Sequence, residues 1–384
     1  MAGFDDMTVE ELRAGGSLKW SLFPDAIGSF VAEMDFGTAP AVTKALHAAV
    51  DGAVFGYLPP ALLQGMSEAY AAWSRDRYGW AVPPERVRPV ADVLAGLAAA
   101  IEHFSRPGSP VLLPTPAYMP FLTLPPALGR EVIEVPMARD GDRYVYDLDA
   151  LDAGFRAGGH LLVLCNPHNP IGRVLEPAEM TAVAEVVERH GGRVFSDEIH
   201  APLVYPGHRH VPYASLDEVL AGHAVTATSA SKAWNLPGLK CAQLVLSNAA
   251  DADRWARVGL HAEHGASNLG VVANTAAYTA GAGWLADVLA YLDGNRRLLA
   301  ELLTTHLPGV RYTPPEGTYL AWLDCRELDL AEPGPFFLER AGVALTDGLL
   351  CGAAGRGYVR LNVATPRPVL TRAVEQMGAA LAAR

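Results

Sequence analysis

Three short polar segments follow three apolar runs in the middle of the chain, and each carries a side chain that could do chemistry. They are the loop 165–172, which presents Asn169, the segment 196–200, which contains Asp197, and the turn 229–232, which ends at Lys232. Taken singly, each has an ordinary explanation: a rigid Asx turn, a buried acid that needs a partner, or a solvated lysine. Their combination, in this order, points to one shared ligand.

Pyridoxal-5′-phosphate (PLP) is the ligand that fits this combination. Its aldehyde needs an amine that deprotonates near neutral pH, and a buried lysine beside cationic groups can supply one. Its ring nitrogen must stay protonated to draw electrons, and an adjacent carboxylate raises the pKa of that nitrogen. A hydrogen-bond donor for the ring oxygen completes the ring contacts. Its phosphate needs hydroxyls, a cation and helix-start amides.

The elements that must position these side chains follow from the apolar periodicity. Short apolar runs bounded by Gly, Pro, Asn or Ser predict buried strands, and segments of helical spacing separate several of them. In open α/β sheets ligands collect beyond the carboxyl ends of the strands, where the three polar segments fall. The expected strands are 110–114, 161–165, 193–197, 224–228 and 243–247, and the expected helices are 40–51, 61–78, 93–104, 177–190, 285–306 and 367–383.

This alternation predicts an α/β fold with a mostly parallel central sheet flanked by helices on both faces. After about residue 285 the pattern changes to a long helix, short strands at 319–323 and 358–363, and a closing helix, which is typical of a smaller α+β domain. The length of 384 residues suits two domains. We expect an N-terminal segment (1–45) that contributes to the small domain, a large cofactor-binding domain (46–284) and a C-terminal small domain (285–384).

Composition argues against several classes of protein. The formal net charge is −12 and no Lys/Arg run reaches five residues, whereas a nucleic-acid binder needs a basic stripe. The apolar stretches are shorter than the ~20 residues of a membrane span, and the acidic start lacks the basic region of a secretory signal. The four cysteines form no CxxC pair, which favours reduced thiols over a disulfide frame or zinc knuckle. We expect a soluble cytoplasmic enzyme with no nucleic-acid or membrane partner.

Longer segments around these residues resemble those of fold-type I PLP-dependent enzymes, the class I/II aminotransferase superfamily, and more narrowly the MalY/PatB-type cystathionine β-lyases (C–S lyases). The resemblance covers nearly the whole chain and implies a PLP-dependent transferase-like α/β fold. The NPHNP, SDEIH and SxSKxxNLxGLK patterns are typical of the fold and cofactor, and the MDF and DEIH features point to the lyase branch. The segments are VAEMDFGTAPAV (31–42), FGYLPP (55–60), PTPAYMPF (114–121), CNPHNPIGRV (165–174), SDEIHAPLVYPGHRHVPYASL (196–216), SASKAWNLPGLKCAQ (229–243), WLADVLAYLDGNR (284–296) and YVRLNVATPR (358–367).

The resemblance implies roles for individual residues at the cofactor ring. Lys232 would hold PLP as a Schiff base and transfer the α-proton of the substrate, and Asp197 would pair with the pyridine nitrogen. Asn169 would donate to the ring oxygen O3′ and lie near the substrate, and Tyr118 would stack on the ring. Arg360 would bind the substrate α-carboxylate bidentately. The ordinary alternatives are a core tyrosine for Tyr118 and a surface arginine on a strand for Arg360.

The resemblance also implies a phosphate site and a second subunit. Tyr57 would reach the phosphate and substrate of the neighbouring subunit, which implies a homodimer with shared active sites. His200 stands at the ring edge, where many aminotransferases carry a tyrosine that binds O3′, and this difference favours a lyase. The phosphate would be surrounded by Ser229, Ser231, Lys240 and the helix-start amides of Val93 and Leu94.

Three features raise questions about the site. Asp92 lies at the start of the phosphate-binding helix, where a carboxylate opposes phosphate binding unless it turns away to cap the helix. Cys351 stands where relatives tend to carry Phe, so the resemblance does not predict the substrate-side wall of the site. The pair His208 and His210 invites a metal interpretation, but no acidic or cysteine ligand has suitable spacing, so we favour a structural loop and expect no metal.

The function implied by the resemblance is β-elimination, in which L-cystathionine or a related cysteine S-conjugate gives a thiol, pyruvate and ammonia. A class I/II aminotransferase shares every cofactor contact and remains an alternative. A regulatory PLP-binding protein with little turnover is a second alternative, although the retained Lys232, Asp197 and Arg360 argue against it. Because the pocket is built from loops near 27–37 and 345–356, the leaving group stays open among cystathionine, cystine, cysteine conjugates and a specialised thioether.

Overall fold

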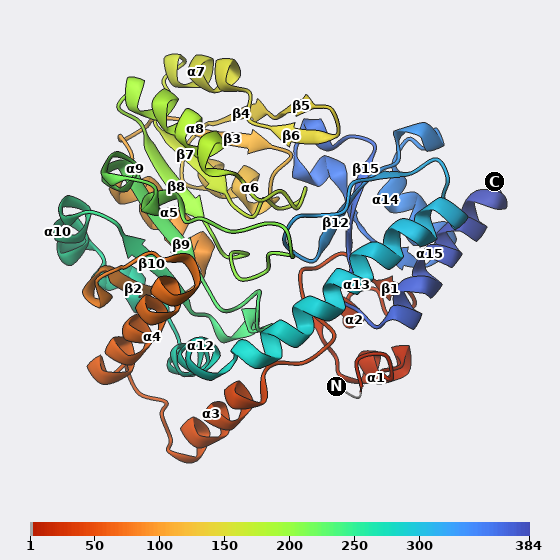
Figure 1. The fold of residues 1–384 in the computed structure, drawn as a ribbon, viewed down its shortest axis with the longest axis horizontal. Helices are drawn as coiled ribbons and strands as arrows, with labels where there is room; N and C mark the ends of the chain where they lie inside the picture. Colours follow the sequence, from red (N-terminus) through yellow and green to blue (C-terminus); the bar gives the residue numbers. More distant parts are fainter. Residues whose placement is uncertain (1–2) are drawn as a thin grey trace.

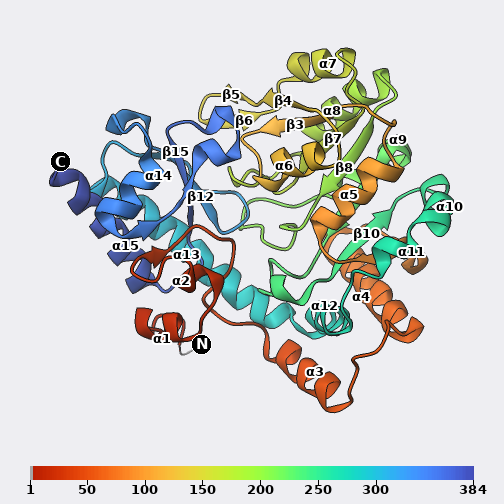
Figure 2. The same cartoon turned by 180° about the vertical axis from the view of Figure 1, so that it is seen from behind.

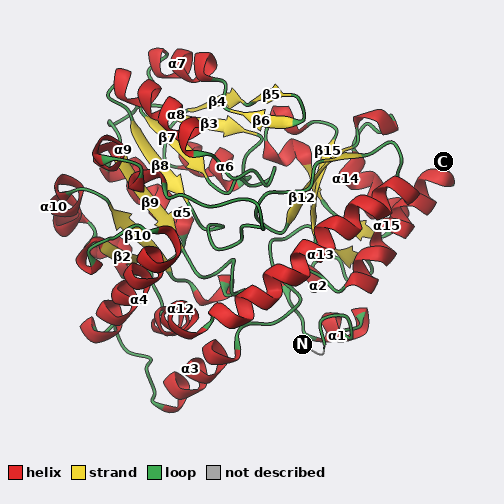
Figure 3. Ribbon diagram, viewed as in Figure 1, coloured by secondary structure: helices red, strands yellow, loops and turns green. Residues whose placement is uncertain are grey.

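Two β-sheets with helices packed around them organise the chain (Figure 1). The structure is a computed structural model that describes residues 3–384, so the first two residues of the expected N-terminal segment lie outside it. A seven-stranded sheet occupies the middle of the sequence, and a four-stranded sheet is formed by its last third. Figure 3 shows the two sheets as separate groups of strands with helices around each.

The larger sheet has the strand order β2-β10-β9-β8-β7-β3-β4. The five neighbouring strands from β9 to β4 are parallel, whereas β10 is antiparallel to both β9 and β2. The prediction of a mostly parallel sheet is therefore confirmed. The strands are β2 (Val87–Val90), β3 (Val111–Thr115), β4 (Val132–Pro136), β7 (Leu161–Cys165), β8 (Arg193–Asp197), β9 (Ala224–Thr228) and β10 (Ala242–Leu246).

Helices cover both faces of this sheet. Along β7, Leu162 and Leu164 belong to one apolar core, whereas Leu161 and Val163 belong to another. The first core includes α7 (Leu148–Arg156) and α8 (Pro177–Arg189), and the second includes α5 (Val93–His103) and α6 (Pro120–Ala127). The reverse view shows α5 and α6 in front of the strands (Figure 2). Because both faces are buried, the strands are almost continuously apolar.

The smaller sheet is antiparallel, with the order β11-β12-β15-β14, and the start of the chain joins this half. A separate parallel pair is formed by β1 (Ile27–Gly28) and β13 (Val343–Ala344), which brings the N-terminal segment beside the last third of the chain. The limits of the three expected segments stay a prediction. The four strands are β11 (Arg311–Tyr312), β12 (Leu320–Asp324), β14 (Thr346–Asp347) and β15 (Tyr358–Asn362), and the long helices nearby are α13 (Ala282–His306) and α15 (Arg367–Ala382).

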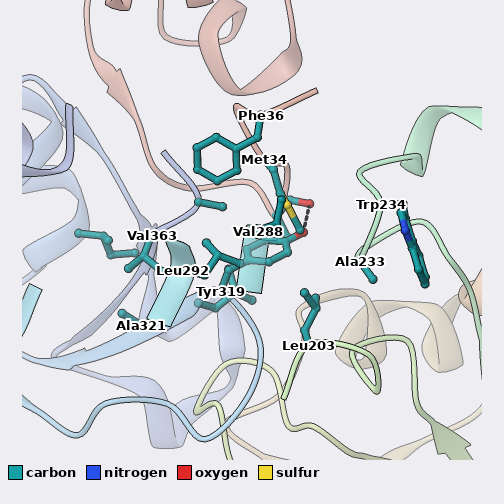
Figure 4. Close-up of a cluster of buried hydrophobic side chains, with 14 of the residues drawn as sticks. Met34, Phe36, Leu203, Ala233, Trp234, Val288, Leu292, Tyr319, Ala321 and Val363 are labelled. Atoms are coloured by element: carbon teal, nitrogen blue, oxygen red, sulfur yellow. Dashed lines mark hydrogen bonds between the residues drawn. The ribbon is translucent and has the colours of Figure 1, made fainter. Parts of the chain in front are cut away.

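A third apolar core joins the N-terminal segment to both halves of the molecule. Met34 and Phe36 lie in it with Trp234 and Tyr319, as Figure 4 shows. The remaining elements are α1 (Val9–Ala14), α2 (Leu18–Ser21), α3 (Pro40–Asp51), α4 (Pro60–Tyr78), the hairpin of β5 (Ala138–Asp140) and β6 (Arg143–Val145), α9 (Glu218–His223), α10 (Ala249–Val258), α11 (Leu260–Glu263), α12 (Asn268–Ala280), α14 (Pro333–Phe336) and short 3₁₀ or π turns.

The strands and helices expected from periodicity all form, and the largest shift is α13, which begins at Ala282 instead of 285. Many elements were not among the expectations, for example helices α6, α7, α10 and α12 and strands β2 and β4. Within residues 3–384, no helix combines the length and apolar character that crossing a membrane requires.

Candidate active site

The three polar segments meet at one edge of the larger sheet. Asp197 is the last residue of β8, Cys165 is the last residue of the parallel neighbour β7, and the two are register partners. On the other side of β8, Asp197 pairs with Ala227 of β9, and Ser229 follows two residues later. The loop with Asn169 and the turn with Lys232 therefore leave the strand ends on either side of Asp197, as the sequence predicts.

Lys232 projects toward the N-terminal segment. Its Nζ donates a hydrogen bond to the carbonyl oxygen of Ala32 at 3.0 Å. Burial lowers the pKa of Lys232 to about 8, and the positive charge of Arg360 acts in the same direction. A lysine with this pKa provides an uncharged amine near neutral pH, which carbonyl chemistry requires.

Asp197 is buried at the end of β8 and has no cationic partner in direct contact within the described residues. Its Oδ1 accepts a hydrogen bond from the Ile199 backbone N–H at 3.1 Å, and the Cys165 Sγ lies 3.5 Å from its Oδ2. Burial raises the pKa of Asp197 to about 6. The carboxylate is thus a buried anion that a protonated ring nitrogen can compensate.

Arg360 of β15 links three segments at the site. Its Nη1 donates to Asn169 Oδ1 at 2.9 Å, and its Nη2 donates to the Phe30 carbonyl at 2.8 Å and to Thr346 Oγ1 at 3.2 Å. The side chain is 2% exposed, its Nε has no hydrogen-bond partner, and none of the described carboxylates forms an ion pair with it. A buried guanidinium without a counterion is a ready receptor for a substrate carboxylate.

Asn169 and His200 are both buried beside this arginine. Because the Asn169 Oδ1 accepts from Arg360, its Nδ2 is directed elsewhere and donates to none of the described residues, so it is free for a ring oxygen. Burial lowers the pKa of His200 to about 3, helped by the charges of Lys232 and Arg360. His200 is therefore neutral, and its Nδ1 lacks a partner.

Tyr118 lies just before α6 and is partly exposed. Its ring packs edge-to-face on Phe121 with centroids 5.3 Å apart. Burial raises the pKa of its hydroxyl, and the charges of Arg360, Asp197 and Asp92 also act on it. Tyr118 thus lies within electrostatic range of the predicted carboxylate-binding, ring-binding and phosphate-binding residues, and its ring-stacking role stays a prediction.

The predicted phosphate site lies at the start of α5. Val93 and Leu94 are its first two residues, whose N–H groups have no partner within the helix. Asp92 caps the helix through Ala95 N–H at 2.8 Å, and its other oxygen lies 2.9 Å from Lys240 Nζ. The carboxylate has thus turned to the helix and the lysine, so the amides of Val93 and Leu94 remain open to phosphate.

The two serines of the predicted phosphate site differ in their contacts. Ser229 Oγ donates to the Cys241 carbonyl at 2.7 Å and accepts from Ser231 N–H at 3.0 Å. Its hydroxyl therefore braces the turn in this structure. Ser231 is partly exposed, and its hydroxyl makes no hydrogen bond to the described residues, which leaves it free to bind phosphate.

Tyr57 is separated from these residues in the single chain. It is 95% exposed and lines a cavity of about 910 Å³ with Phe55, Leu58 and Leu260. Its predicted role needs a second subunit and stays a prediction. Cys351, by contrast, is fully buried in an apolar core with Trp322 and Tyr358.

The two histidines considered for a metal have different surroundings. His210 is buried and its Nε2 lies 2.9 Å from Glu198 Oε2, whereas His208 is exposed. Glu198 also accepts from Ser196 Oγ and from the Tyr213 N–H, so this pair anchors the loop. Within residues 3–384, no group of three or more His, Cys, Asp or Glu side chains is placed to hold a metal.

Sequence reasoning missed how the segment 30–35 is held against the site. Asn362 Nδ2 donates to the carbonyls of Val31 and Glu33 at 2.7 and 2.6 Å, and Asn235 exchanges two hydrogen bonds with the Met34 backbone at 2.9 Å. Tyr319 Oη donates to the Ala32 carbonyl at 2.9 Å. Both asparagines lie inside the quoted patterns, but their targets are backbone groups that no pattern reveals.

The residues present fit PLP. One edge of the sheet holds an amine with a pKa near 8, a buried carboxylate without a cation in contact and a free amide donor, and a helix start lies nearby. These groups match the aldehyde, ring nitrogen, ring oxygen and phosphate of the cofactor. The unpaired Arg360 then provides a place for a substrate carboxylate.

Comparison with known proteins gives the same assignment. Residues 30–377 match the family model described as aminotransferase class I and II. The chain belongs to this family. Within it, the chain is 38% identical to the cystathionine β-lyase of Corynebacterium glutamicum, over 97% of this chain and 99% of that protein. It is 33% identical to the cystathionine β-lyase PatB of Bacillus subtilis, over 97% and 98%.

A solved structure from Corynebacterium diphtheriae, of a candidate PLP-dependent β-cystathionase, superposes with a TM-score of 0.92. It is 40% identical, and the match covers 99% of each chain. The family, its fold-type I architecture and its C–S lyase branch are thereby confirmed. PLP is the cofactor of the family, and this chain is a PLP-dependent enzyme.

Proposed function

We propose that this protein is a C–S β-lyase that cleaves the Cβ–S bond of L-cystathionine or a related cysteine S-conjugate. With cystathionine and one water, the products are homocysteine, pyruvate and ammonia. The observation that carries the proposal is the buried Arg360, which has no acidic partner and lies in electrostatic range of a lysine with a pKa of about 8. The names of the full-length relatives support the same reaction.

The residues divide the work of elimination. Arg360 binds the α-carboxylate, which fixes the rotation of the amino acid and so decides which bond at Cα is broken. Lys232, whose uncharged form is available near neutral pH, removes the proton from Cα. Asp197 keeps the ring nitrogen protonated. PLP, when bound, supplies the electron sink that makes loss of this proton feasible.

His200 and Asn169 supply neutral contacts at the ring edge. Asn169 donates through Nδ2 because its oxygen is occupied by Arg360. His200 stays uncharged because burial holds its pKa at about 3. An uncharged imidazole adds no second positive charge beside Lys232, and this helps Lys232 to act as a base.

A direct assay tests the reaction. Incubation with L-cystathionine and PLP, without any keto acid, should release pyruvate and a free thiol in equal amounts. Lys232→Ala should abolish both products and the visible absorption band that depends on the covalent bond between the lysine and the cofactor. Turnover that depends strictly on a keto-acid acceptor would identify an aminotransferase instead, and a normal absorption band with no turnover of any β-substituted amino acid would favour a regulatory protein.

We further propose a homodimer with shared sites. The 910 Å³ cavity beside Tyr57 is lined by exposed apolar side chains, including Phe55 at 64% and Leu260 at 69% exposure. A second copy would cover this surface and give Tyr57 a partner site. The four buried, unpaired cysteines fit a reducing compartment, so we place the enzyme in the cytoplasm.

A further inference from the structure

Glu33 is an acidic residue at the site to which neither cofactor chemistry nor α-proton transfer assigns a task. It follows Ala32, whose carbonyl accepts from Lys232 Nζ at 3.0 Å and from Tyr319 Oη at 2.9 Å. Its own carbonyl accepts from Asn362 Nδ2 at 2.6 Å, so its backbone is fixed. Its carboxylate acts electrostatically on both Lys232 and Tyr319.

The carboxylate of Glu33 lacks a partner in the described chain. Its Oε2 is buried and accepts no hydrogen bond. Neither Lys232 nor Arg360 pairs with this carboxylate, since Lys232 donates to Ala32 and Arg360 donates to Asn169, Phe30 and Thr346. A partly buried carboxylate without a donor has lost part of its hydration, and a cationic group that binds there compensates this loss most strongly.

The substrate supplies one cation that the site has not yet accommodated. A cysteine thioether presents an α-carboxylate to Arg360 and an α-amine to the cofactor at Lys232. In L-cystathionine a second ammonium stands on the leaving, sulfur-linked part. The segment that carries Glu33 contacts Arg360 through Phe30 and Lys232 through Ala32, and the charge of the Glu33 carboxylate acts on Lys232, so an amino acid held by Arg360 and Lys232 would lie next to this segment.

We propose that Glu33 is the specificity-determining carboxylate that receives the ammonium group of the leaving thiol, and that the preferred substrates are thioethers with a cationic amine there. This inference rests on the proposed C–S lyase function. It selects cystathionine-like diamino acids over neutral or purely anionic cysteine conjugates. A substrate that lacks the ammonium leaves the partly buried Glu33 carboxylate without a partner and is therefore disfavoured.

Three substrates test this preference because their leaving groups differ in charge. L-Cystathionine carries an ammonium and a carboxylate there, S-(3-aminopropyl)-L-cysteine only an ammonium, and S-(3-carboxypropyl)-L-cysteine only a carboxylate. The wild type should prefer the two ammonium-bearing compounds. Glu33→Gln should lower their kcat/KM by roughly 10–100-fold and change the carboxypropyl compound by less than about threefold, because a charge-assisted hydrogen bond is lost. Glu33→Asp should retain the preference, and Glu375→Gln on the exposed face of α15 should change nothing.

Binding gives a second readout that does not need turnover. In calorimetry with PLP-loaded protein, the double variant Lys232→Ala/Glu33→Gln should bind the aminopropyl compound more weakly than Lys232→Ala alone, by a factor similar to the fall in kcat/KM. An equal fall of kcat/KM for all three substrates would show that Glu33 acts on Lys232, and would overturn the inference. The inference would also be overturned if Glu33→Gln kept the preference for ammonium-bearing substrates, or if light scattering showed that this variant no longer forms a dimer. If no substrate yields pyruvate in the wild type, the proposed function fails instead.

Discussion

Two buried charges at the site, those of Arg360 and Asp197, have no oppositely charged partner in the described chain, and the cofactor and the substrate would supply one for each. Arg360 has no carboxylate in contact, and Asp197 has no cation in contact, among the described residues. Each is buried, so each raises the energy of the cofactor-free protein. PLP and substrate would remove this cost, and binding energy would then appear as added stability of the folded chain.

The amine of Lys232 makes cofactor capture depend on pH. Only uncharged lysine attacks the aldehyde, and because the pKa of Lys232 is about 8, its uncharged fraction rises as pH increases toward 8. The rate at which the cofactor-free protein captures PLP should therefore rise roughly tenfold per pH unit below 8 and level off above it. Stopped-flow absorbance measures this rate. A small amine titrated in parallel corrects for the free cofactor, and a flat profile from pH 6 to 8 would contradict the expectation.

At the scale of elements, the position of a residue just beyond a strand end can be predicted from the sequence. Contacts between segments far apart in the chain cannot. Asn169, Asp197 and Lys232 were predictable because parallel strand ends share one edge. The contact of Lys232 with Ala32 was not, since it joins residues 200 positions apart and ends on a backbone oxygen. Ser229 shows the same limit, because its hydroxyl is taken by the carbonyl of Cys241.

A buried ion pair holds the N-terminal segment in register. Lys19 is fully buried; its Nζ lies 2.8 Å from Asp35 Oδ2, and Trp20 Nε1 donates to Asp35 Oδ1 at 2.8 Å. Asp35→Asn would leave the buried ammonium without a counter-charge, so we expect a loss of about 3–5 kcal/mol in the free energy of unfolding, seen as a lower urea midpoint. Asp76→Asn, in the exposed pair with Arg75, is the matched control and should shift the midpoint far less.

This change should also act on the site. Asp35 lies two residues after Glu33 on the segment that presents the Ala32 carbonyl to Lys232. The folded fraction of Asp35→Asn should therefore bind PLP more weakly than the wild type, as titrated by absorbance. Unchanged cofactor affinity together with unchanged stability would show that the pair positions nothing.

At the scale of the whole molecule, Tyr57 is the predicted site residue whose role needs a second subunit. Its side chain is 95% exposed in an apolar surface, which no single-chain role explains. The sequence predicted the contact only through resemblance, because nothing local to the FGYLPP segment reveals a neighbouring subunit.

Subunit mixing tests the shared site. Tyr57→Ala and Lys232→Ala should each be weakly active or inactive. When the two are unfolded and refolded together, a mixed dimer regains one site that contains both native residues, so about a quarter of wild-type activity should return. Mixing Lys232→Ala with Asp197→Ala is the control that should restore nothing, since both residues belong to the same chain's site. No recovery in the first mixture would place Tyr57 outside the active site.

The segment around residues 30–35 has a consequence for how the enzyme is made. It is synthesised about 330 residues before Asn362 and Arg360, which hold its backbone. The nascent chain therefore has Lys232, Asp197 and the start of α5 long before the carbonyl of Ala32 can reach the lysine. Stable capture of the cofactor therefore waits until β15 has been synthesised, and a chain released before β15 would carry the lysine in an unfinished site.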